Sequence, residues 1–151
     1  MKVRPFRRLA STLVVVAALA PTACDFGTEP LFAIFWSGTF SADPSAPFII
    51  GGTTEMVANP GDTSAGIFLD AAVTEPVTMG WHIRYGACGE TGDRVAGMDA
   101  FPPVTITETG SGTALASIRR RLPAGSYAAE VFTAHDATGD RLACADLIQE
   151  S

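Results

Sequence analysis

Apolar and polar residues alternate along most of the chain after residue 30, which is typical of half-buried β-strands. Segments rich in β-branched and aromatic residues are separated by clusters of Gly, Pro, Asp and Asn, and no long segment has the 3.6-residue period of a helix. We therefore predict about eight strands, over Leu31–Ser41, Thr53–Ala58, Gly66–Thr74, Val77–Tyr85, Val104–Thr107, Thr113–Leu122, Ser126–Thr133 and Arg141–Ile148.

The alternation also assigns faces to side chains, because neighbouring residues of a strand point to opposite sides of the sheet. In the segment WHIRY, the bulky Trp81, Ile83 and Tyr85 share the face expected to meet the core, which leaves His82 and Arg84 facing outward. The same rule separates the side chains of the run 119–121 (RRR), so this run predicts no one-sided basic patch.

Short strands at this spacing, with turn signals between them, favour an all-β antiparallel sandwich or barrel. The segment 31–151 is long enough to bury one such core. We therefore predict a single β-sandwich domain over residues 31–151.

The first 23 residues have the composition of an export signal. An apolar run, Leu9–Ala20, follows the basic residues Lys2, Arg4, Arg7 and Arg8 and is shorter than the roughly 20 residues of a membrane span. Small residues and Cys24 come next, and this arrangement resembles a bacterial lipoprotein signal. The resemblance implies cleavage before Cys24, lipid on Cys24, and a short tether over residues 24–30.

Pro21 stands where such signals usually have leucine, so plain secretion with cleavage after Ala23 is the alternative. Either route predicts an exported protein of the cell envelope.

Removal of residues 1–23 makes the chain strongly acidic. Four of the ten basic residues lie in this segment and no acidic residue does. The remainder therefore contains six arginines and sixteen acidic residues. Such a surface argues against nucleic acid and against anionic lipid headgroups as partners. We expect membrane contact through the Cys24 lipid, and an envelope protein partner of unknown identity.

Three cysteines are present, and if Cys24 carries lipid, Cys88 and Cys144 remain as an even pair. Oxidising compartments outside the cytoplasm allow such a pair to form a disulfide. The wide separation of the two cysteines does not suit a CxxC redox or metal motif.

Two segments carry a resemblance to a known family. Trp81–Cys88 (WHIRYGAC) resembles the strand and loop of Cu/Zn superoxide dismutase, in which a His-x-His pair precedes a cysteine. Gly139–Ile148 (GDRLACADLI) is similar to the closing segment of that family, and Gly125-Ser126-Tyr127 to the related CHRD-type secreted domains. The resemblance implies a Greek-key sandwich, a disulfide between Cys88 and Cys144, and a position for Arg141 beside the copper of the family.

The ligand set of the family is incomplete in this chain. His82 matches the first histidine of the pair, but Arg84 stands in place of the second, and a guanidinium stays protonated and cannot bind a metal. The loop 89–103 contains no histidine, and the later copper histidine falls near Phe132. His135 is the other histidine of the chain. We therefore interpret His82, Arg84 and Arg141 as positions of a former metal site, or as the corresponding positions of a relative that never bound metal.

The sequence thus predicts a non-catalytic envelope lipoprotein with a binding or structural role, with no cofactor and no catalytic residue. The alternative is a mononuclear copper or other metal protein that uses His82 and His135 and retains some dismutase-like chemistry. An adhesion or ligand-binding sandwich whose loops contact the ligand is a third hypothesis.

Overall fold

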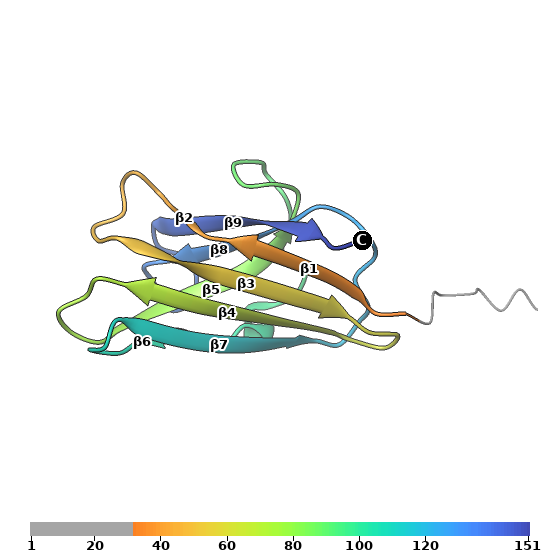
Figure 1. The fold of residues 1–151 in the computed structure, drawn as a ribbon, viewed down its shortest axis with the longest axis horizontal. Coiled ribbons are helices and arrows are strands. Elements are labelled where there is room, and N and C mark those ends of the chain that lie inside the picture. The colour runs from red at the N-terminus through yellow and green to blue at the C-terminus, as the bar shows by residue number, and fades with distance from the viewer. Residues whose placement is uncertain (1–31) are drawn as a thin grey trace, which may run out of the picture.

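A computed structural model describes residues 32–151, so the predicted signal peptide, tether and lipid site at Cys24 lie outside the described residues. The described chain is almost entirely β (Figure 1). Its elements are β1 (Ile34–Thr39), β2 (Ser41–Ala42), β3 (Ile50–Ala58), β4 (Thr63–Ala71), β5 (Val77–Tyr85), the 3₁₀ turn η1 (Met98–Ala100), β6 (Val104–Ile106), β7 (Ser111–Ile118), β8 (Tyr127–Phe132) and β9 (Arg141–Gln149).

The strands form one antiparallel sheet in the order β6-β5-β8-β9-β1-β3-β4-β7, and β2 pairs with β9. The sheet curls until its two ends meet, because a tight turn joins β6 to β7: the Thr107 amide donates to the carbonyl of Ser111. The result is a nearly closed barrel. The prediction of an all-β antiparallel domain is confirmed at this level.

The core lies inside the curled sheet and consists of the inward-facing residues of each strand. Trp81 and Ile83 of β5 are fully buried, and the alternate residues Ala114, Ala116 and Ile118 of β7 are buried as well. Strand β5 therefore buries the Trp81 and Ile83 side chains that the alternation assigned to the core. Trp36 of β1 packs edge-on against Tyr127 of β8 in this core, with 5.5 Å between ring centroids.

Several strand predictions differ from the structure at their ends. The predicted strand Leu31–Ser41 is divided into β1 and β2, because the chain leaves β3 at Thr39 and pairs with β9 from Ser41 onward. Strands β3 and β4 begin three residues earlier than predicted. Strand β7 ends at Ile118, and the following backbone turns away to bond the buried hydroxyl of Thr63.

No helix among residues 32–151 is long and apolar enough to cross a membrane.

Candidate functional site

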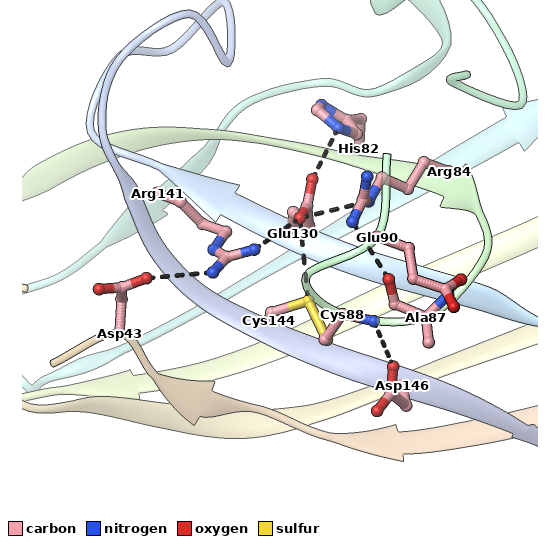
Figure 2. The surroundings of a disulfide bond; sticks show 10 residues. All are labelled: Asp43, His82, Arg84, Ala87, Cys88, Glu90, Glu130, Arg141, Cys144 and Asp146. Carbon is pink, nitrogen blue, oxygen red and sulfur yellow. Dashed lines mark hydrogen bonds and ion pairs between the residues drawn. A yellow bond between two sulfur atoms is a disulfide. The ribbon is translucent and has the colours of Figure 1, made fainter. Parts of the chain in front are cut away.

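A polar cluster lies on the outer face of β5, β8 and β9, beside a disulfide (Figure 2). The strand register creates it, since His82 of β5 is paired with Glu130 of β8, and Glu130 is paired with Cys144 of β9. We call the five side chains that meet here the Glu130 network: Asp43, His82, Arg84, Glu130 and Arg141.

Glu130 is the centre of the network and faces three nitrogen groups. Nε2 of His82 lies 3.3 Å from Oε2 of Glu130, and Nε of Arg84 lies 3.3 Å from Oε1. Nη1 of Arg141 donates to Oε1 over 3.1 Å, and its Nη2 donates to Asp43 over 3.2 Å. The Glu130 carboxylate therefore holds β5, β8 and β9 together, and Arg141 connects this carboxylate to Asp43 in the loop after β2.

Burial makes these contacts stronger than surface ion pairs. The side chains of His82, Arg84 and Glu130 are each less than a tenth exposed, whereas Arg141 is about one-third exposed (34%). The outward direction predicted for His82 and Arg84 is correct, but both side chains are covered. Exposed pairs contribute little to stability, while breaking a buried pair strands a charge.

The network sets the ionisation of its two carboxyl groups. Burial alone would raise the pKa of Glu130, but the hydrogen bonds from His82 and Arg141 and the charge of Arg84 outweigh it and lower the pKa. The pKa of Asp43 is lowered by hydrogen bonds from the amide and hydroxyl of Ser45, and then by Arg141. The hydrogen bond to Glu130 raises the pKa of Arg141. Each ion thus favours the charged form of the next.

The other side of the His82 ring is apolar. The ring stacks on Phe132, with 4.9 Å between centroids and 25° between planes. Phe132 is the residue near which the resemblance puts a later copper histidine, and an aromatic ring supplies no ligand there. Nδ1 of His82 is buried and has no hydrogen-bond partner among the described residues.

The disulfide Cys88–Cys144 is formed and ties the loop after β5 to β9. The Cys144 sulfur lies 3.9 Å from Glu130, so the disulfide adjoins the network (Figure 2). Two more contacts hold the loop: Asp146 accepts the amide of Cys88 over 2.6 Å, and Arg84 donates to the carbonyl of Ala87 over 3.1 Å. Arg84 therefore belongs both to the loop and to the network.

His135 does not join the network. It is exposed in the loop between β8 and β9, and its backbone, not its ring, approaches β5 at Gly80. Among residues 32–151, no group of three or more His, Cys, Asp or Glu side chains is arranged to hold a metal ion. His82 is the one imidazole in the Glu130 network. The guanidinium groups of Arg84 and Arg141 contact the same Glu130 carboxylate.

An open groove of about 700 Å³ runs over the disulfide between β1, the loop after β2 and β9. Arg141 and the carboxylates Asp43, Glu55 and Asp146 line it together with hydroxyl groups of β1 to β3. The Glu130 network forms one end of this groove through Arg141 and Asp43.

Sequence reasoning found His82, Arg84, Arg141 and both cysteines but missed Glu130 and Asp43. A signal for Glu130 was present, because it is the single charged residue of the apolar strand YAAEVF. A lone charge in a buried strand requires a partner. No local signal existed for Asp43, which lies 98 residues from its partner in sequence.

No family model matches this chain, and neither the curated proteins nor the solved structures compared with it give a significant match.

Proposed function

We propose that this chain is a non-catalytic lipoprotein of the bacterial cell envelope, whose domain has the Greek-key fold of Cu/Zn superoxide dismutase without its metal centre. The observation that carries this proposal is the Glu130 network. Arg84 and Arg141 both contact the carboxylate that His82 contacts, and a site shared by two fixed cations repels a metal ion.

The strand order supports the Greek-key part of the proposal. Strands β5, β6 and β7 follow one another across the sheet, and β8 then returns to lie beside β5. Three successive neighbouring strands with a fourth returning beside the first is the Greek-key arrangement. The Cys88–Cys144 bond and the place of Arg141 near the outward side chains of β5 agree with the resemblance as well.

The disulfide supports export, because such bonds persist in oxidising compartments. In this proposal lipid on Cys24 holds the domain at a membrane, and the domain serves as a rigid binding or structural element. The groove over the disulfide is its contact surface for a ligand or partner, since rigid strands and a covalent bond fix its walls.

Two measurements test the proposal. Mass spectrometry of the full chain made in a bacterial envelope should show cleavage before Cys24 and added lipid, both absent from a Cys24→Ala variant. Calorimetric titration of the disulfide-bonded mature chain with copper and with zinc should show no stoichiometric binding. Binding that a His82→Ala variant loses would instead establish a mononuclear metal protein.

A further inference from the structure

Charged side chains are distributed unequally between the two ends of the barrel. One end, which we call the distal end, carries the loops after β2, β4, β6 and β8, and we call the opposite end, where β1 begins, the tether end (Figure 1). The distal end carries one arginine, Arg141, and a set of carboxylates: Asp43, Asp70, Glu75, Glu108, Asp136 and Asp140. It is therefore strongly negative.

The tether end is different in charge and in polarity. The run Arg119, Arg120 and Arg121 follows β7 there, and the loop after β5 adds Arg94, Glu90 and Asp93 to the carboxylates Asp62 and Glu150 of this end. The end is thus close to neutral, with three of its arginines in one loop. The net charge of the whole chain, which argues against anionic lipid, does not describe this end.

An exposed aromatic side chain lies next to the arginine loop, since Phe32 is 82% exposed. Arg121 donates to the carbonyl of Phe32 over 2.7 Å, so the arginine loop and Phe32 are held side by side. Arg120 points back to the barrel, where it bonds the Tyr85 hydroxyl, and Arg119 is exposed. Arginine combined with an exposed Phe is a composition found in segments that bind the membrane interface.

The length of the preceding chain places this end near a membrane. Only residues 25–31 separate Cys24 from Phe32, and at about 3.5 Å per residue they reach at most about 25 Å. A lipid on Cys24 therefore keeps the tether end at high effective concentration beside the bilayer, so that weak contacts suffice to orient the domain.

We propose that the tether end docks on an anionic phospholipid surface through Phe32 and Arg119. This inference rests on the proposed lipid attachment at Cys24. The negative distal end is repelled by the same surface, so attraction and repulsion select one orientation. Nine-residue strands then carry the distal loops about 30 Å from the bilayer, where they face the envelope space.

Amide hydrogen exchange of the lipidated full chain in vesicles tests the docking. We expect slower exchange in peptides covering 32–36 and 119–126 in phosphatidylcholine vesicles with added phosphatidylglycerol than in phosphatidylcholine alone, with the distal loops unchanged. Arg119→Gln should reduce the protection about fivefold, which corresponds to ~1 kcal/mol for one arginine near an anionic surface. Phe32→Ser should reduce it in both kinds of vesicle.

Glu108→Gln is the matched control, because it removes one charge from an exposed turn at the distal end and should leave the protection unchanged. Equal exchange in the two kinds of vesicle, or protection of the distal loops instead, would overturn the docking. If mass spectrometry shows no lipid on Cys24, the proposed function fails separately. The docking is then tested on mature chain coupled through the Cys24 thiol to a maleimide phospholipid, and the same two results decide it.

Discussion

Replacing Glu130 with glutamine tests whether the network stabilises the fold. The change keeps the size of the side chain and removes its charge, which leaves the buried guanidinium of Arg84 without a counter-ion. Breaking a buried pair in this way costs about 3–5 kcal/mol. Arg84 keeps its bond to the carbonyl of Ala87 and Arg141 keeps Asp43. We therefore expect the lower end of the range, about 3 kcal/mol.

Urea unfolding followed by the fluorescence of the two buried tryptophans, Trp36 and Trp81, measures this cost. With a slope of about 2 kcal/mol per molar urea, the midpoint should fall by about 1.5 M at unchanged slope. Asp43→Asn is the control, because it removes a partner that is more exposed and leaves Glu130 paired. Its midpoint should change little. Equal midpoints for the two variants would refute the reasoning that burial makes Glu130 the centre of the network.

Three further outcomes are expected. The pKa of Glu130 is lowered from its ordinary 4.5, so the stability that ionised Glu130 contributes is complete above about pH 4.5 and is lost as the pH falls through the folded-state pKa. In unfolding measured from pH 7 to pH 3, Glu130→Gln should lack this acid-sensitive component. Parallel curves of unfolding free energy against pH for the two proteins would contradict this. Reduction of Cys88–Cys144, which are 56 residues apart, should lower the free energy of unfolding by about 4 kcal/mol, and an unchanged melting temperature in dithiothreitol would contradict this. Gly80→Ala should cost about 2 kcal/mol by overpacking, because its Cβ would meet the carbonyl of Ala134; Gly51→Ala has open space around it and is the control.

The local rules of strand formation were sufficient to predict most of the fold. Alternation in WHIRY predicted which side chains of β5 enter the core, and Gly, Pro, Asp and Asn clusters predicted most turns. The ends of β1 and β3 were missed for a physical reason. Whether a residue such as Ser41 continues β1 or starts β2 depends on which neighbouring strand its backbone bonds, and that pairing is not local.

The Glu130 network could be predicted only in part for the same reason. Alternation put His82 and Arg84 on one face of β5, but their partner depends on the register of β8 against β5. Once that register is known, Glu130 must lie opposite His82. The stacking of Phe132 on His82 also follows from the register, and it explains how one face of the His82 ring is covered by an apolar side chain.

The interpretation of β5 as a former metal strand makes a prediction that can be tested by restoring a ligand. In Arg84→His, two imidazoles project from the same face of β5, and Glu130 lies across from the first. The substitution also removes one of the two guanidinium groups at this carboxylate. We expect zinc to bind with a stoichiometry of one, and at a concentration of 100 times Kd to stabilise the fold by about 2.7 kcal/mol.

Thermal unfolding with and without zinc measures this gain, and circular dichroism checks that the variant keeps its β-structure. Arg119→His is the matched control, because it also replaces an arginine with an imidazole, at an exposed position after β7 that is outside the Glu130 network. Zinc should not change its melting temperature. If Arg84→His folds but gains no more from zinc than Arg119→His does, the outward face of β5 lacks the geometry of a metal strand. The resemblance of WHIRYGAC to the dismutases would then reflect only a shared strand and disulfide.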